Sequence, residues 1–194
     1  MMLFSTGVEF RNKYVTQEEW PKLKPNKVQY PTGGLPIVSI NGKRYYETMS
    51  TLRSLAMGIG VYETSDHKGC YVNDIIMDEY NNVFEKSGAL IMAQNEEEKK
   101  IAFGNFLAAI DRILCIVKMN KVANKWKYAA GNEDLGTGDF CIAALYFNFA
   151  KNEAFEASMM VLPVFEKHVE LADYYAILQK ALRKYLKQRK TLPF

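Results

Sequence analysis

The chain has 194 residues, of which 48% are hydrophobic and 24% charged, so it can bury a core without a metal or a disulfide to hold it. Its formal net charge of +3 gives no strong attraction to nucleic acid or to an anionic membrane. No apolar run reaches the roughly 18 residues of a membrane span, and residues 1–10 lack the pattern of a signal peptide. We expect a globular protein with no nucleic-acid or membrane partner.

The three cysteines, Cys70, Cys115 and Cys141, form no C-x-x-C pair, which argues against a disulfide framework and against a metal site. Cys115 and Cys141 lie in apolar runs and are expected in the core, whereas Cys70 is expected near the start of a helix. The two histidines are far apart in sequence, so a Cys–His hydrolase is disfavoured. Reduced cysteines of this kind are typical of a cytoplasmic protein.

The first part of the chain mixes short elements with breakers. Residues 8–15 alternate in hydrophobicity and have the character of a strand. Residues 16–23 can form a short helix, with Thr16 as its cap and Glu19 three residues on. Prolines and glycines then prevent regular structure over residues 21–34.

A hairpin and a helix follow. Residues 35–40 form an apolar strand, Asn41-Gly42 is a strong hairpin signal, and residues 43–46 are the return strand. A helix is predicted next, with Thr48 or Ser50 as its cap and with apolar residues on one face, namely Leu52, Leu55, Ala56 and Ile59.

Beyond about residue 65 only helical periodicity remains. Pro163 must kink or split one of these helices, and the basic residues after Leu182 are interpreted as a solvated helix end. The predicted helices cover residues 72–83, 103–117, 137–149, 155–169 and 171–185. The sequence therefore predicts two domains, a small α/β unit over residues 1–64 and an all-helical unit over residues 65–194.

Several segments, in chain order, resemble one family. No single segment would suffice, but their order spans nearly the whole chain. They are EEWPKLKP (18–25), PTGGLPIV (31–38), NGK (41–43) with ET (47–48), LRSLA (52–56) and YLKQRKTLPF (185–194). Together they are similar to sigma-class-like glutathione S-transferases.

The resemblance implies the glutathione transferase fold, a thioredoxin-like α/β N-terminal domain followed by an all-α C-terminal domain. It implies a homodimer that uses reduced glutathione as co-substrate, without a metal, and conjugates it to small hydrophobic electrophiles in detoxification. Three aromatic residues, Tyr80, Phe84 and Phe106, are loose candidates for the electrophile pocket, and core packing is the alternative for each.

The same resemblance carries glutathione-binding roles onto individual residues. Pro36 is a candidate cis proline that would turn the Leu35 main chain outward to pair with glutathione, and an ordinary trans proline is the alternative. Gly34 stands where the family often has a longer polar residue. Glu47 and Thr48 stand at a helix N-terminus suited to the γ-glutamyl group, with simple capping as the alternative.

Trp20 and Lys24 are spaced like the family's contacts to the glycine carboxylate of glutathione; domain packing and a free surface lysine are the alternatives. Asp74 matches the carboxylate that reaches glutathione on the partner subunit. Asp78, one turn later, is the alternative register, and a solvated helix face is the alternative for either residue.

A structural capping motif is predicted at residues 135–139. Leu135 and Phe140 would form a hydrophobic staple, and Asp139 would accept from the main chain of the cap residue. The cap position holds Gly136 where serine or threonine is usual, and glycine supplies no side-chain oxygen.

The family's first strand and helix, which carry its catalytic tyrosine, normally precede the segment that residues 3–10 resemble. On this alignment they are absent, and Ser5, Thr6 and Tyr14 do not stand in the tyrosine's place. The catalytic residue is therefore unknown. Either the sequence is an incomplete gene product or it is a short paralogue with impaired catalysis and a binding or structural role. An isomerase or peroxidase that uses the same glutathione site is a third possibility.

Overall fold

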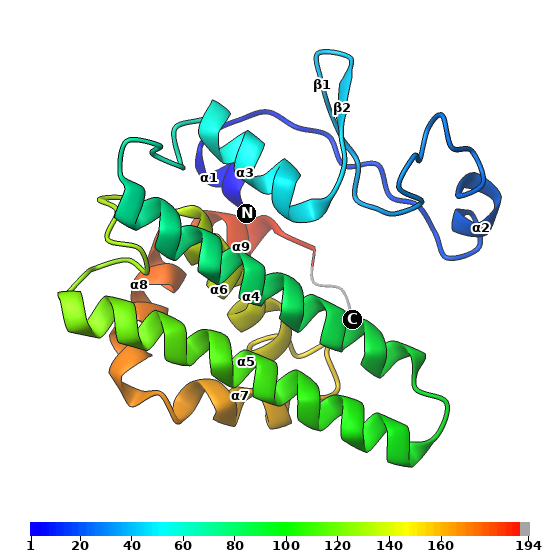
Figure 1. Ribbon diagram of the computed structural model, residues 1–194. Helices are drawn as coiled ribbons and strands as arrows, with labels where there is room; N and C mark the ends of the chain where they lie inside the picture. Colours follow the sequence, from blue (N-terminus) through cyan, green and yellow to red (C-terminus); the bar gives the residue numbers. More distant parts are fainter. Residues whose placement is uncertain (191–194) are drawn as a thin grey trace.

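The computed structural model describes residues 1–190, and the final segment 191–194 of the family resemblance lies outside the described residues. A helical body carries a small, loop-rich N-terminal part along one side (Figure 1). The elements are α1 (Met2–Ser5), α2 (Trp20–Leu23), β1 (Val38–Ile40), β2 (Lys43–Tyr45), α3 (Thr48–Gly58), α4 (His67–Met92), α5 (Glu96–Asn124), α6 (Thr137–Leu145), the π-helical turn η1 (Tyr146–Ala150), α7 (Ser158–Glu166), the 3-10 turn η2 (Val169–Leu171), α8 (Ala172–Ala181) and α9 (Arg183–Gln188).

The strand expected over residues 8–15 is not formed. This stretch has no regular structure and is mostly exposed. A strand needs a neighbour for its main-chain N–H and C=O groups. Within residues 1–190 the sheet consists of β1 and β2 alone, so residues 8–15 have no strand beside them. The hydrophobic alternation there was insufficient to predict a strand.

The predicted hairpin is confirmed. Strands β1 and β2 are antiparallel, with Val38 opposite Tyr45 and Ile40 opposite Lys43. The two turn residues have positive φ angles, 49° at Asn41 and 81° at Gly42, as a type I′ turn requires. The first strand is shorter than expected, because residues 35–37 precede the ladder without joining it.

Helix α3 begins where expected but is not capped by Thr48 or Ser50. Its N-cap residue is Glu47, whose side chain makes no capping bond. Instead the Thr51 hydroxyl donates to the carbonyl oxygen of Tyr46 over 3.0 Å. Thr51 and Ala56 are buried against the helical body, which fixes the rotation of α3.

The helical body is built around α4 and α5. They are joined by the three residues 93–95, and so short a connection makes them antiparallel neighbours along most of their length (Figure 1). The predicted apolar face of α5 is confirmed, since its buried positions recur at helical spacing, namely Phe106, Ile110, Ile113, Leu114 and Val117. Helix α6 is buried on nearly every side and forms the centre of the core.

The later helices differ from the predicted limits. The helix expected over residues 137–149 ends at Leu145 and continues as a π-helical turn, in which Tyr146 stacks on Tyr175 at a centroid distance of 4.7 Å. Helix α7 begins only at Ser158, and Pro163 lies inside it without splitting it. Cys141 is buried as expected, whereas Cys115 is half-buried.

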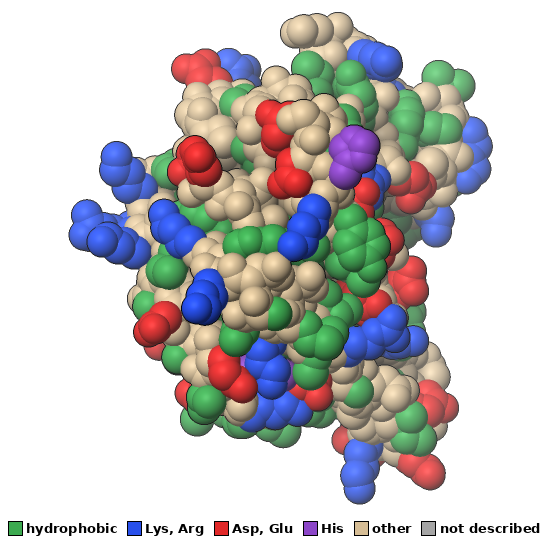
Figure 2. Space-filling view, turned by 60° about the vertical axis from the view of Figure 1, so that its left-hand side comes forward, with side chains coloured by type: hydrophobic (Ala, Val, Ile, Leu, Met, Phe, Trp, Pro, Cys, Tyr) green, Lys and Arg blue, Asp and Glu red, His purple; other side chains and the backbone are tan. Residues whose placement is uncertain are grey.

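The core lies almost entirely in the helical body. None of residues 3–50, all described by the structure, is buried. On the face shown in Figure 2, basic and acidic side chains are interspersed rather than gathered by sign. Within the described residues, no helix is long and apolar enough to cross a lipid bilayer.

Candidate functional site

Two pairs of the predicted binding residues flank the open end of the hairpin, which we call the hairpin foot. The ladder ends at Val38 and Tyr45, so Leu35 and Pro36 lead into β1 while Glu47 and Thr48 follow β2. The Leu35–Pro36 peptide bond is cis, as expected. All four residues are exposed, so their main-chain and polar groups are accessible to a ligand.

Glu47 has an unusual backbone. Its φ of 65° and ψ of 122° lie in a region that non-glycine residues rarely occupy, and residues held in this way are frequent at ligand sites. Thr51 holds this conformation from two sides, because its hydroxyl bonds Tyr46 and its N–H donates to the Glu47 carbonyl over 2.9 Å. The first N–H groups of α3 therefore face outward beside Glu47 and can bind an anion.

Residues 16–34 form a separate lobe that contains helix α2 (Figure 1). The predicted contact Trp20 begins this helix, and Lys24 directly follows it. The indole of Trp20 packs edge-on against Tyr30 at 5.2 Å between centroids. Lys24 is exposed, and its Cε would lie 3.7 Å from a Cβ added at Gly33. Lys24 thus stands close to the Gly33–Gly34 turn that leads into Leu35, and its ammonium can approach an anion bound there.

The lobe is held by local bonds. The helix predicted over residues 16–23 begins only at Trp20, with Glu19 as its N-cap residue. Thr16 and Glu19 still bond each other across the preceding turn, with the Glu19 carboxylate accepting from the Thr16 N–H over 2.9 Å and the Thr16 hydroxyl accepting from the Glu19 N–H over 3.1 Å. Arg44 of β2 donates to the carbonyl of Gln29 over 3.4 Å, which connects the lobe to the hairpin.

Asp74 of α4 is paired within its own chain. Its carboxylate accepts from Arg53 Nε of α3 over 2.9 Å. Burial opposes the charge of Arg53, but the bond to Asp74 raises the pKa of the guanidinium. Burial, together with the neighbouring Cys70 and Asp74, raises the pKa of Tyr62, so its phenol stays protonated. Asp78, the alternative register, is exposed.

The predicted capping motif of α6 is formed. The Asp139 carboxylate accepts from the Gly136 N–H over 2.8 Å, from the Ala129 N–H over 2.9 Å and from the Tyr174 hydroxyl over 2.6 Å. Burial raises the pKa of Asp139, and the three donors oppose that shift because they favour the carboxylate. The oxygen that Gly136 lacks comes from Asn73 of α4, whose Oδ1 accepts from the Gly138 N–H over 2.9 Å.

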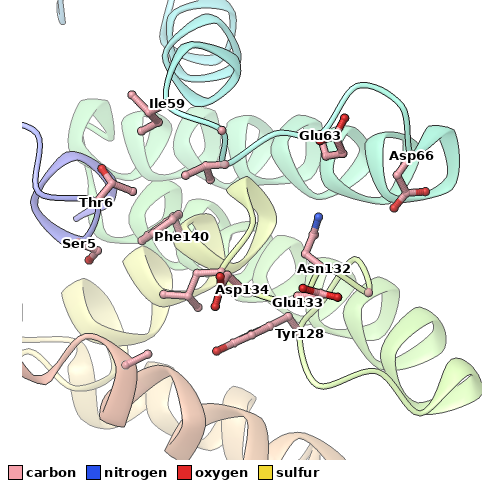
Figure 3. Close-up of a pocket in the computed structure, with 15 residues that line it drawn as sticks. Ser5, Thr6, Ile59, Glu63, Asp66, Tyr128, Asn132, Glu133, Asp134 and Phe140 are labelled. Atoms are coloured by element: carbon pink, nitrogen blue, oxygen red, sulfur yellow. The ribbon is translucent and has the colours of Figure 1, made fainter.

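A cleft of about 840 Å³ lies elsewhere, between the end of α1, the α3–α4 connection and the α5–α6 connection. Glu63 and Asp66 stand across it from Glu133, with Asp134 and Tyr128 below (Figure 3). Its lining contains carboxylates but no lysine, arginine or histidine, and none of the predicted glutathione-binding residues. Its negative charge makes it unsuited to an anionic ligand, so we place the candidate site at the hairpin foot.

The three loose candidates for an electrophile pocket are placed differently. Phe106 is fully buried and packs edge-on against Phe149 at 5.3 Å, so it belongs to the core. Tyr80 is half-buried, and burial raises the pKa of its phenol. Phe84 is 53% exposed and lies tilted against Tyr80 at 6.2 Å.

The sequence analysis did not predict the structural roles of three residues, namely Thr51, Arg53 and Asn73. The Thr51 hydroxyl reaches back five residues to Tyr46, which lies outside the usual i−3 and i−4 spacing of such bonds, so no common local pattern indicates it. Arg53 and Asn73 act on residues 21 and 65 positions away, and no local pattern indicates such partners.

No family model matches the chain. Among curated proteins, the chain is 32% identical to glutathione S-transferase S1 of Drosophila melanogaster over 99 residues, which are 50% of this chain and 38% of the relative. It is 26% identical to glutathione S-transferase 4 of Caenorhabditis elegans over 180 residues, 90% of this chain and 81% of the relative. The matches to the first two curated relatives thus span less than half of each relative's length.

The fold is shared with solved structures. A glutathione S-transferase from the hookworm Necator americanus, described as monomeric, superposes with a TM-score of 0.77 at 21% identity, over 97% of this chain and 89% of the other. This confirms the expected architecture of a small sheet-containing part followed by a helical domain.

Proposed function

Because the chain has the glutathione S-transferase fold and is related to that family by sequence, we propose that it binds reduced glutathione at the hairpin foot and transfers it to small hydrophobic electrophiles. The observation that supports the proposal is the hairpin, whose first strand follows the cis Leu35–Pro36 bond and whose second strand leads to Glu47 and Thr48 at the start of α3.

The chemistry of these groups suits the ends of glutathione. The Leu35 main chain pairs with the cysteinyl main chain as an added strand would. The α3 N-terminus and the Thr48 hydroxyl hold the γ-glutamyl carboxylate, while Glu47 accepts from the amino group. Trp20 and Lys24 donate to the glycine carboxylate, and the Gly33–Gly34 turn brings that end of the peptide close to Lys24.

The finer assignments are also proposals. We propose sigma-like specificity, a role in detoxification and a cytoplasmic setting, the last supported by three free cysteines. We propose a homodimer, in which Asp74 would reach the partner's glutathione after leaving Arg53. Sedimentation velocity of the purified chain tests the dimer, and a monomer at micromolar concentration would contradict both the dimer and the role of Asp74.

Calorimetric titration of the folded chain with glutathione tests the site. We expect a dissociation constant in the micromolar to millimolar range. Lys24→Gln should weaken binding by up to about fivefold, because an exposed ion pair contributes up to about 1 kcal/mol. Lys22→Gln, on the same short helix, is the matched control and should bind like the original chain. Equal affinities for the two variants would contradict the assignment of Lys24.

A second candidate is a catalytically impaired homologue with a binding or structural role. Turnover of glutathione with a chlorodinitrobenzene distinguishes the two. Conjugation above the uncatalysed rate supports the transferase, whereas binding without turnover supports the impaired homologue. An organic hydroperoxide as second substrate tests the peroxidase alternative, and a ketosteroid tests the isomerase.

A further inference from the structure

A second cluster of chemically active side chains lies on the opposite side of α5 from the glutathione region's elements. Asp111 and Cys115 stand one turn apart on α5, and His168 lies between α7 and η2. One donor atom from each residue lies within 4.8 Å of the donor atoms of the other two. His168 is 4% exposed, while Asp111 and Cys115 are half-buried, so the cluster is held in place on one side and open to solvent on the other.

Some donor atoms of the cluster are not used by its existing hydrogen bonds and ion pairs. His168 Nε2 and Lys167 Nζ both lie 2.7 Å from the same oxygen of Asp111, Oδ1. Within residues 1–190, Oδ2 of Asp111 and the Cys115 thiol make no hydrogen bond or ion pair. The existing contact already brings a ring nitrogen of His168 and an oxygen of Asp111, two atoms of ligand type, to 2.7 Å from each other beside Cys115.

The donor set indicates the ligand. One nitrogen, one sulfur and one carboxylate oxygen match the three protein ligands of a tetrahedral Zn²⁺ site whose fourth position holds water. Bond lengths of about 2.0–2.3 Å require the three donors to lie roughly 3.3–3.6 Å apart. The present separations are at most 4.8 Å, and that between His168 Nε2 and Asp111 Oδ1 is 2.7 Å, so binding requires small adjustments of these side chains.

We propose that Asp111, Cys115 and His168 form a binding site for a divalent transition-metal ion of the Zn²⁺ type. Binding releases the proton of the Cys115 thiol to solvent and requires the single ring proton of His168 to be on Nδ1, so that Nε2 can coordinate the metal. It also displaces Lys167 from the Asp111 carboxylate, since the cation and the metal compete for it. The site joins α5 to the α7–η2 connection. It is independent of the proposed glutathione function.

Co²⁺ is a suitable probe because a cobalt–thiolate bond gives a charge-transfer absorption in the near ultraviolet. The chelator-treated full chain should bind one equivalent of Co²⁺ with this band, and Zn²⁺ should abolish it. Cys115→Ser should lose the band. Cys70→Ser is the matched control, because Cys70 is also half-buried and free but lies outside the cluster, and it should keep the band.

Lys167→Met should raise the affinity for Co²⁺, a change opposite in sign to that in Cys115→Ser. A purely structural role of the cluster would not predict such an increase. The Lys167 side chain is 55% exposed, so the variant should fold, and removal of the competing cation should tighten Co²⁺ binding. Absence of the band in the original chain, a band that survives in Cys115→Ser, or an unchanged or weaker affinity in Lys167→Met would each overturn the proposal.

Discussion

Asn73 of α4 and Gly136, the residue before α6, together form the N-terminal cap of α6. The Asn73 amide oxygen takes the place of the side-chain oxygen that a serine or threonine cap would supply. A Cβ added at Gly136 would lie 2.9 Å from that oxygen and 2.7 Å from Oδ1 of Asn132, so the cap residue must be small while Asn73 is present. A cap of α6 therefore exists, but it comes from α4.

Substitutions at these two residues should be non-additive. Gly136→Ser should lower the free energy of unfolding by about 1–3 kcal/mol through crowding, and Asn73→Ala should lower it by a similar amount through an unpaired Gly138 N–H. The double variant should lose less than the sum. Removal of the Asn73 amide relieves one close contact and releases Asn132, whose Oδ1 accepts from Asn73 Nδ2, so Asn132 can move and the serine hydroxyl can cap α6. Urea unfolding of the four proteins measures the coupling, and simple additivity would contradict the shared cap.

Asp139 should be far more sensitive than its acidic neighbours. In Asp139→Asn an amide NH₂ replaces one oxygen and meets an N–H or the Tyr174 hydroxyl, so we expect a loss of about 2–3 kcal/mol in the free energy of unfolding. Asp134→Asn, on the exposed loop just before the motif, should change stability by less than about 0.5 kcal/mol. Thermal denaturation of both variants provides the comparison.

At the scale of elements, the hairpin and α5 should respond in opposite ways to the same glycine substitution. Gly42 has a φ of 81°, so Gly42→Ala should destabilise the hairpin by about 1–2 kcal/mol and weaken glutathione binding at its foot. Gly104 is exposed within α5 with open space at its Cβ position, so Gly104→Ala should stabilise the protein by about 0.5–1 kcal/mol.

Two measurements separate these effects. Urea unfolding should register Gly104→Ala but hardly Gly42→Ala, because the hairpin contributes no buried residue to the core. Glutathione titration should register Gly42→Ala and not Gly104→Ala. A large loss of global stability in Gly42→Ala would show that the hairpin and the helical body unfold together, against this expectation.

Features that depend on residues close together in the sequence were predicted correctly, whereas features that depend on distant residues were not. The Asn41-Gly42 turn, the Thr16–Glu19 bonds and the Asp139–Gly136 bond depend on residues at most three positions apart, and all three are formed. The turn also sets the register of β1 and β2, so the hairpin itself follows from local sequence. In contrast, a strand over residues 8–15 depended on a neighbour that local alternation does not report.

Contacts between distant residues were not predictable for the same reason. Nothing around Arg53 indicates Asp74, and nothing around Cys115 indicates His168, because each pair meets only once the helices pack. The one sequence signal for the latter cluster was the four-residue spacing of Asp111 and Cys115, which places both on one face of a helix. That spacing is too common to identify a site alone.

At the scale of the whole molecule, the uneven core predicts uneven local stability. Residues 3–50 hold no buried side chain, whereas α4, α5 and α6 contain most of the core. We expect amide hydrogens of the lobe and hairpin to exchange much faster than those of α5 and α6, since regions with few buried contacts open locally. Mass spectrometry of deuterium uptake checks this, and saturating glutathione should slow exchange at the hairpin foot without changing α5.

The placement of the core also affects synthesis on the ribosome. Residues 3–50 emerge before α4 and α6, yet α3 can dock only when both of these helices are available. About 95 further residues must be added before α6 ends at Leu145, which takes roughly 5–20 s at ordinary elongation rates. During that interval the helical body that carries the hairpin and lobe has not yet been fully synthesised. The hairpin and lobe of the nascent chain are therefore accessible to chaperones and proteases before the helical body has formed.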